Sequence, residues 1–436
     1  MSSSWAHYPS KGYKTVNQLT MEEDTPIDLN AFKKIDECVH ISTEGSQVVQ
    51  FYKGKSVLIT GGLGFLGKLI IEKLLRTCKD IKKMYLIVRP KGKKNATTRI
   101  QEALRNTLFS ELQKVHPKFE EKLIVIEGDL SQPGLGISKE DRQMLEDNVN
   151  IVIHTAASVK LDEKLRFAAG INIRGTNEIV NLVQNCKNLS SFVYVSSAYS
   201  NCAHREIEEQ IYFTPYSADD ILKLVETQGE KLDGKDQWIL GRWPNTYVFS
   251  QAISETTVTK QCTGLPACIF RPGVISSTTK EPLKGWINNY SGAVGILAYI
   301  QKGILRCLNS NPEKVIEIVP GDYVANGIIV AAYNNQFNKS TNMKIYNFVS
   351  SPENPISQND FFGLAQYYGS ETPTSQSIWY PYSTYVENYY MYYFFSFLLH
   401  ILPALFQDSI SVILGTKPKM LHMYKNIHQF TKASLQ

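Results

Sequence analysis

The chain has 436 residues, of which 43% are hydrophobic and 20% are charged, and its formal net charge is +5. This composition excludes a largely disordered protein, and the lack of any stripe of lysine and arginine argues against nucleic-acid binding. The seven cysteines and eight histidines do not have the CxxC or paired-histidine spacings of metal sites, so we predict no bound metal.

Residues 1–50 are polar and have no sustained periodicity, so we expect a flexible N-terminal tail. The segment Ser56–Gly67 that follows reads SVLITGGLGFLG and predicts a buried strand over 56–60, a tight turn and a helix over 65–78. Two glycine registers fit, GxGxxG from Gly62 or GxxGxxG from Gly61. Both leave the backbone N–H groups of a helix N-terminus free to bind a pyrophosphate, so the segment predicts a dinucleotide site.

The run Met84–Val88 predicts the second strand, and Arg89 follows it in place of the acidic residue that would hold a ribose 2′-hydroxyl. An arginine at this point favours a 2′-phosphate, and hence NADPH. The alternative is a solvated basic loop that Arg89 shares with Lys91, Lys93 and Lys94.

Strand-like runs at 123–130, 149–154, 191–196 and 267–270 alternate with helical patterns at 97–115, 164–185 and 246–263. This alternation predicts an α/β fold, a doubly wound parallel-sheet Rossmann domain with ligands bound at the carboxyl ends of its strands. We assign residues 51–375 to this NADPH-binding domain, including insertions that shape a substrate pocket. The candidate cofactor-binding residues are Thr60, Gly61, Gly62, Gly64, Phe65, Leu66, Gly67, Arg89, Asp129, Leu130, Ala156, Ala157, Pro272 and Val274.

Residues 376–436 are rich in aromatic side chains, and we expect a C-terminal helical domain that could associate with a membrane. Within it, Tyr389–Phe406 is a nearly continuous apolar run at the lower limit of length for spanning a bilayer. Pro403 and His400 argue against a plain span, and His400 is expected to be a hydrogen-bonded core histidine. Three interpretations stay open: a buried helix, an interfacial or re-entrant segment, and a span.

Two polar residues occupy positions that suit reductive chemistry. Ser197 follows a predicted strand, and Tyr247 lies at the start of a predicted helix. A phenol that is hydrogen-bonded to a substrate carbonyl can deliver a proton while a nicotinamide delivers hydride, and a serine hydroxyl can hold the same oxygen. We therefore take Ser197 and Tyr247 as the candidate catalytic pair.

Several motifs, in this order along the chain, resemble those of the fatty acyl-CoA reductases within the extended short-chain dehydrogenases. They are TGGLGFLG at 60–67, AASVKLDE at 156–163, INIRGT at 171–176, VSSAYSNC at 195–202 and GRWPNTYVFSQA at 241–252. The resemblance extends from about Phe51 to Ile427. It implies NADPH-dependent reduction of a long-chain fatty acyl-CoA to the fatty alcohol through an aldehyde, inside the cell at a peroxisomal or endoplasmic reticulum membrane.

In this resemblance Ser197 matches the active-site serine or threonine, and Tyr247 matches the tyrosine of YxxxK. Gln251 occupies the position of the lysine. Because that lysine lowers the pKa of the phenol and binds the nicotinamide ribose, two interpretations stay open: a reductase slowed by about 10- to 100-fold, or a binding protein that has lost turnover. A sugar-nucleotide epimerase or dehydratase is a third class, and the aromatic C-terminal segment argues against it.

Two further residues each keep two interpretations. Asp129 would either hold the amino group of adenine or cap a loop. Asn172 resembles the asparagine that supports a water relay in the wider superfamily, and it would equally serve to pack a helix.

Overall fold

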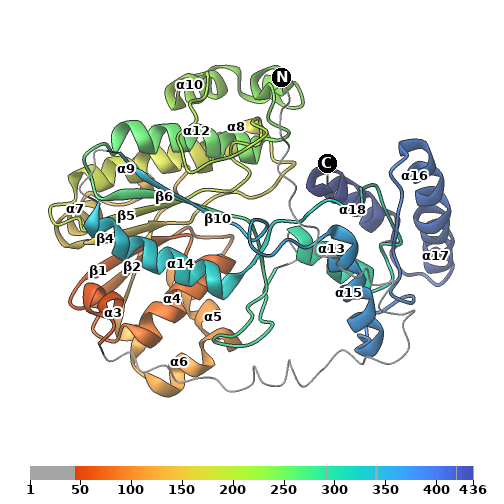
Figure 1. Ribbon diagram of the computed structural model, residues 1–436, viewed down its shortest axis with the longest axis horizontal. Coiled ribbons are helices and arrows are strands. Elements are labelled where there is room, and N and C mark those ends of the chain that lie inside the picture. The colour runs from red at the N-terminus through yellow and green to blue at the C-terminus, as the bar shows by residue number, and fades with distance from the viewer. Residues whose placement is uncertain (1–44, 290–291, 339–341, 419, 436) are drawn as a thin grey trace, which may run out of the picture. The chain divides into compact units, whose positions relative to one another are not determined.

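The computed structural model describes residues 45–289, 292–338, 342–418 and 420–435 (Figure 1). The tail that we expect over residues 1–50 falls mostly outside the described residues, although residues 47–50 belong to helix α3 (Gln47–Tyr52). The described chain divides into two compact units. The larger lies within residues 45–294, 317–352 and 428–435, and the smaller within 295–316 and 353–427. This division differs from the boundary at residue 375 that composition suggests, since residues 295–316 and 353–375 belong with the C-terminal segment.

A seven-stranded parallel sheet forms the centre of the larger unit, in the order β10-β6-β5-β4-β1-β2-β3. Its strands are β1 (Ser56–Thr60), β2 (Lys83–Val88), β3 (Leu123–Glu127), β4 (Ile151–His154), β5 (Ser191–Val195), β6 (Ala267–Pro272) and β10 (Lys344–Phe348). Every neighbouring pair is parallel, so all the carboxyl ends meet at one edge, and the strand order reverses between β1 and β4. The predicted doubly wound Rossmann fold is confirmed.

Helices cover both faces of this sheet (Figure 1). One face carries α4 (Phe65–Thr77), α5 (Ala96–Leu104), α6 (Ser110–Val115) and α14 (Gly321–Asn334), and the other carries α7 (Lys139–Asn148), α9 (Gly175–Asn185) and α12 (Thr246–Gln261). Side chains alternate along each strand, so Val57 and Ile59 of β1 join the first core and Leu58 joins the second. Burial on both faces explains why the strands read as continuous apolar runs.

Two predicted helices are interrupted. The helix predicted over 97–115 divides into α5, the 3₁₀ turn η1 (Thr107–Phe109) and α6, because the Asn106 side chain accepts the N–H of Leu108 and starts a new turn. The helix predicted over 164–185 divides into α8 (Leu165–Ala168), the π-helix η4 (Ala169–Arg174) and α9. The larger unit also contains α10 (Ala218–Gln228), α11 (Gln237–Leu240), and the paired strands β7 (Val274–Ser276) and β9 (Ile318–Pro320).

The smaller unit contains the paired strands β8 (Cys307–Leu308) and β11 (Thr384–Tyr385), and helix α15 (Gln358–Glu371). Three consecutive elements follow: α16 (Tyr389–Ser396), the π-helix η7 (Phe397–Ile401) and α17 (Leu402–Ile413). Along the sequence, α13 (Gly292–Gln301) and α18 (Met420–Leu435) each contain a boundary between the units.

The helix over Tyr389–Ile413 is long and apolar enough to cross a membrane, with a mean hydropathy of 1.4, and only 17% of its apolar window is buried. Tyr390 is 82% exposed and Phe406 is 70% exposed, so the structure does not support the interpretation as a buried helix. The helix continues through Pro403. A proline has no N–H to donate to the carbonyl one turn earlier, and that carbonyl lies in the π-helix η7, where the regular α-helical hydrogen bonding is already interrupted. His400 is buried, and its Nε2 accepts the N–H of Arg306 at 2.9 Å, as expected of a core histidine.

Candidate active site

The glycine turn between β1 and α4 requires glycine at two positions. Gly61 has a φ of 71°, and a Cβ there would lie 2.8 Å from Thr155 Oγ1. A Cβ on Gly67 would lie 2.3 Å from the carbonyl oxygen of Gly61, so α4 can approach the turn only without a side chain there. The strict positions therefore belong to the GxxGxxG register, while Gly62 packs against side chains of the core.

Helix α4 begins with backbone N–H groups that are available to a ligand. Gly64 is its N-cap and provides no side chain, and its own N–H donates to the Gly61 carbonyl at 2.8 Å. The N–H groups of Phe65, Leu66 and Gly67 lie in the first helical turn, where no intrahelical acceptor exists. A glycine cradle at an uncapped helix N-terminus fits a dinucleotide pyrophosphate.

The ends of β1 and β4 are joined behind this turn by a neutral histidine. Thr60 Oγ1 lies 2.6 Å from His154 Nδ1, and His154 Nε2 lies 3.1 Å from Thr176 Oγ1. Burial lowers the pKa of His154 to about 3, so the ring is uncharged at neutral pH. The N–H of Ala156 donates to Thr60 Oγ1 at 3.3 Å, which fixes Ala156 and the following Ala157 at the carboxyl edge.

Arg89 lies directly after β2, with about half of its side chain exposed, and its Nη1 is 3.7 Å from Asp129 Oδ2. Asp129 acts as a loop cap, since its Oδ1 accepts hydrogen bonds from the N–H and the hydroxyl of Ser131. The neighbouring Leu130 is half-buried and packs over Gly175 of α9. The exposed guanidinium is placed to meet an anionic group at this edge of the sheet.

The candidate catalytic residues come together from β5 and α12. Ser197 follows β5 and is buried, and Tyr247 and Gln251 lie one turn apart in α12. Burial raises the pKa of Tyr247 above its ordinary value, and hydrogen bonding with Ser197 and Gln251 opposes the rise. The phenol is therefore protonated at neutral pH, and Ser197 and Gln251 lie beside it.

Comparison with known proteins decides the family. The chain is 39% identical over 407 residues to fatty acyl-CoA reductase wat of Drosophila melanogaster. The matched region covers 92% of this chain and 78% of that protein. The chain belongs to the fatty acyl-CoA reductase family. Fatty acyl-CoA reductase 1 of Homo sapiens is 33% identical, over 88% of this chain and 74% of its own length, and the male sterility protein family model, an NAD-binding one, matches residues 59–328.

Solved structures agree on the fold. The terminal R domain from the myxalamid PKS-NRPS biosynthetic pathway has a TM-score of 0.55 at 18% identity, over 77% of this chain and 72% of that chain. A thiolation-reductase di-domain from an archaeal non-ribosomal peptide synthetase has a TM-score of 0.53 at 20% identity, over 88% of this chain and 96% of that chain. This fatty acyl-CoA reductase family member thus shares the fold of reductase domains.

Two residues of this family member that sequence reasoning missed lie behind the Ser197 loop. Arg271 of β6 is fully buried and donates to Glu255 of α12 through Nε at 2.9 Å and through Nη2 at 2.8 Å. Glu255 also accepts hydrogen bonds from Ser196 Oγ and Ser200 Oγ, at 2.6 and 2.8 Å. The ion pair therefore holds both ends of the segment that carries Ser197. Glu255 lies two helical turns after Tyr247, and that spacing is the only local signal that could have indicated it.

The last two cofactor candidates lie at the end of β6 and just after it. The carbonyl of Pro272 accepts the N–H of Ala198 at 2.9 Å, which ties this strand end to the residue after Ser197. Val274 begins β7, and its N–H donates to the Glu317 carbonyl at 2.8 Å. Asn172 lies in η4, where its Oδ1 accepts the N–H of Ser158 at 2.7 Å and its Nδ2 donates to Ser250 Oγ of α12 at 2.8 Å.

The segment GWINN at 285–289 also contacts the glycine turn. The Trp286 ring stacks on Phe65, with centroids 5.3 Å apart and ring planes 10° apart, and its Nε1 donates to Asn106 Oδ1 at 3.0 Å. Phe65 therefore has a packing partner that fixes the start of α4.

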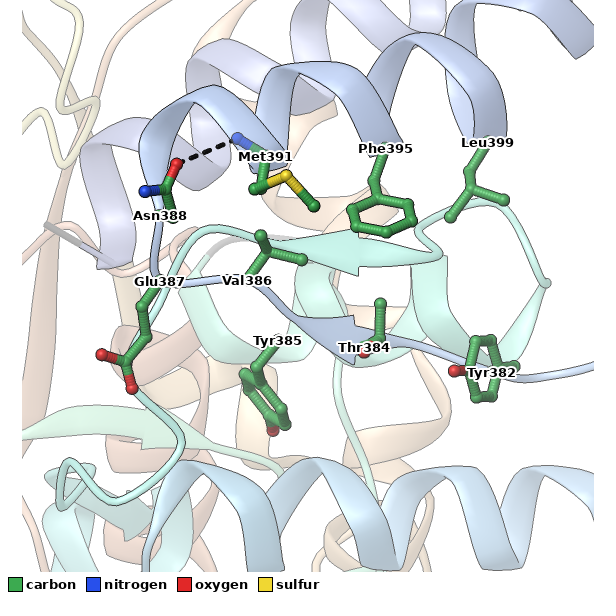
Figure 2. Close-up of a pocket in the computed structure, with 9 residues that line it drawn as sticks. All are labelled: Tyr382, Thr384, Tyr385, Val386, Glu387, Asn388, Met391, Phe395 and Leu399. Atoms are coloured by element: carbon green, nitrogen blue, oxygen red, sulfur yellow. Dashed lines mark hydrogen bonds between the residues drawn. The ribbon is translucent and has the colours of Figure 1, made fainter.

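The smaller unit contains a groove of about 610 Å³ between β11 and α16 (Figure 2). Met391, Phe395 and Leu399 line it at helical spacing, and Tyr382 and Val386 line it from the strand side.

Within the described residues, no group of three or more His, Cys, Asp or Glu side chains could hold a metal ion.

Proposed function

We propose that this protein reduces long-chain fatty acyl-CoA to the fatty alcohol with NADPH, through an aldehyde. The observation that carries the proposal is the grouping of Ser197, Tyr247 and Gln251 at the carboxyl edge of the sheet that also bears the glycine turn. The fatty acyl-CoA reductases to which the chain is similar supply the substrate class.

The preference for NADPH is supported by Arg89. Its exposed guanidinium follows β2, where a ribose 2′-phosphate would lie, and no carboxylate stands in its position to bind a 2′-hydroxyl. Asp129 is its nearest carboxylate and is engaged by Ser131, so the arginine keeps donors free for a phosphate.

NADPH supplies the hydride when it is bound. Tyr247 gives its phenolic proton to the carbonyl oxygen of the aldehyde, and Ser197 donates a hydrogen bond to the same oxygen. As the proton leaves, charge develops on the phenol oxygen, and the Gln251 amide stabilises it more weakly than an ammonium would. In the first reduction, the thioester carbon gains hydride and releases CoA as the thiol. Each of the two reductions takes up one proton, and Tyr247 gives that proton in both.

A second candidate function is favoured by Gln251: a protein that binds NADPH and acyl-CoA without efficient turnover. A neutral amide lowers the pKa of Tyr247 less than a lysine would, so the rate of proton delivery falls. Tyr247 remains protonated, however, which is the state that reduction needs. We therefore favour a slow reductase.

We also propose that the helix Tyr389–Ile413 attaches the protein to a membrane. Its exposed side chains are mainly Tyr, Phe, Leu and Ile, and an apolar face of this size costs free energy in water. Tyrosines near its start suit the headgroup region of a bilayer. A membrane location would also suit a substrate and a product with long alkyl chains.

Turnover by the purified protein tests the function. With NADPH and a panel of acyl-CoA chain lengths, we expect alcohol to form together with two NADP⁺ for each acyl-CoA consumed. Binding of both ligands without any NADPH oxidation would replace the reductase by the binding protein. Failure to bind acyl-CoA at all would exclude both candidate functions, the reductase and the binding protein.

A further inference from the structure

A second tyrosine, Tyr194, contacts the candidate active site from the strand side. It lies in β5, three residues before Ser197, and is only 2% exposed. Its hydroxyl donates to Oε1 of Gln251. Burial raises the pKa of Tyr194, and the nearby Ser254 and Thr176 hydroxyls oppose the rise.

This hydrogen bond decides which end of the Gln251 carboxamide faces Tyr247. A carboxamide has one acceptor oxygen and two N–H donors on opposite sides. Because Oε1 accepts from Tyr194, the nitrogen is left to face the other neighbour. Gln251 lies one helical turn after Tyr247 in α12, and its amide lowers the pKa of Tyr247, as a donor near the phenol oxygen would.

We propose that Tyr194 is a positioning residue that holds the Gln251 carboxamide with its N–H toward Tyr247, so that the amide serves as the donor that a lysine provides in YxxxK. This inference rests on the proposed reductase function. When Tyr247 gives its proton to the substrate, the amide N–H stabilises the developing phenolate. A flipped amide would instead place Oε1 against that oxygen and repel it.

The surroundings favour one stable orientation. Tyr194 keeps its proton, because burial, and then the charge of Glu255, raise its pKa far above neutrality. The neighbouring His154 ring lies 5.7 Å from the Tyr194 ring, centroid to centroid, and is neutral, because burial lowers its pKa to about 3. Glu255 is engaged by Arg271 at 2.8 Å. Tyr194 is therefore a fixed donor to Gln251.

The first test removes the donor alone. Tyr194→Phe should lower the single-turnover rate of aldehyde reduction by ~3- to 10-fold, because the amide is free to flip, while the Kd for NADPH stays within about twofold. Tyr85→Phe is the matched control, since Tyr85 is a buried tyrosine on the same face of the sheet, in β2, which β4 and β1 separate from β5, and it should leave the rate unchanged. In a Gln251→Lys background, Tyr194→Phe should cost less than about twofold, because an ammonium has equivalent donors and no orientation to fix. An equal loss in both backgrounds would overturn the proposal.

The second test does not depend on turnover. With 3-fluorotyrosine placed at position 247, a ¹⁹F NMR titration reports the pKa of that phenol directly. Tyr194→Phe should raise this pKa by about half a unit to one unit, because the amide donor is lost. If no variant shows turnover and the pKa still rises, the reductase function fails and the positioning role stands. An unchanged pKa would overturn the positioning role even in an active enzyme.

Discussion

Changing Gln251→Lys is expected to raise the single-turnover rate of carbonyl reduction by ~2- to 30-fold. In the structure a neutral amide lies one helical turn after Tyr247 and lowers the pKa of its phenol. A neutral hydrogen bond contributes about 1 kcal/mol and a charge-assisted one about 1.5–3 kcal/mol, and the difference converts at about 1.4 kcal/mol for each tenfold in rate. Position 251 is only 2% exposed, so water screens the new charge weakly.

The new ammonium also has a cost, because burial lowers the pKa of a lysine. Glu255 cannot offset this cost, since Arg271 and two serine hydroxyls already engage it. The gain should therefore be largest at a pH below the pKa of the new lysine. The assay is stopped-flow decay of NADPH absorbance with a long-chain aldehyde, and single turnover separates proton transfer from product release.

The control is Gln251→Met, which keeps the length of the side chain and removes its hydrogen bonds. This variant should be ~3- to 10-fold slower than the unmodified protein. Tyr247→Phe should abolish reduction while NADPH still binds. If the lysine and methionine variants both react at the unmodified rate, the side chain at position 251 does not act on the phenol and the reasoning is refuted.

Four further predictions concern affinity, stability and attachment. Arg89→Ala should weaken NADPH by ~10- to 100-fold and leave NADH unchanged in a fluorescence titration; an equal loss for both cofactors contradicts the phosphate contact. The pKa of His154 is about 3 in the folded state and near 6.5 in the unfolded state, so the unfolded chain binds more protons between these pH values. The free energy of unfolding should therefore fall as the pH is lowered from 6.5 toward 3, by roughly 2 kcal/mol at pH 5. Denaturant titrations at pH 7 and pH 5 measure this fall, and His154→Gln should reduce it. Glu255→Gln should lower the free energy of unfolding at pH 7 by ~3–5 kcal/mol in the same titration, because it leaves the buried Arg271 without its charged partner. A loss below about 1 kcal/mol would show that the fold does not need the ion pair. Finally, the double change Phe394→Asp and Phe406→Asp should abolish flotation with phosphatidylcholine vesicles, and continued flotation would place the attachment elsewhere.

The centre of the sheet could be predicted because β1, β4, β5 and β6 are buried on both faces and read as apolar runs. The prediction for Ser56–Thr60 matches β1 residue for residue. Helix interruptions were harder, because a cap such as Asn106 breaks a helix without disturbing its hydrophobic period. The exposed face of Tyr389–Ile413 could not be predicted either, since composition alone does not say whether an apolar helix is covered.

The candidate site was predictable where its residues follow strand ends. Ser197 and the glycine turn have that local signal, and Tyr247 and Gln251 share one face of a helix. Tyr194 has no such signal and Glu255 has only its helical spacing from Tyr247, because their hydrogen bonds join residues 55 to 59 positions apart in the chain. Pairing of this kind depends on how α12 packs against the sheet, and it requires the tertiary structure.

The buried ion pair and the amide beside the phenol differ in how freely evolution can change them. Losing either Glu255 or Arg271 alone leaves a buried charge without a partner, so a lineage must exchange both together or pass through an intermediate that folds poorly. Gln251 has no charged partner, and glutamine and lysine codons differ only in their first base. The Glu255–Arg271 ion pair behind Ser197 is thus the more constrained part of the site. The acidity of the Tyr247 phenol, by contrast, can change through a single-base mutation at position 251.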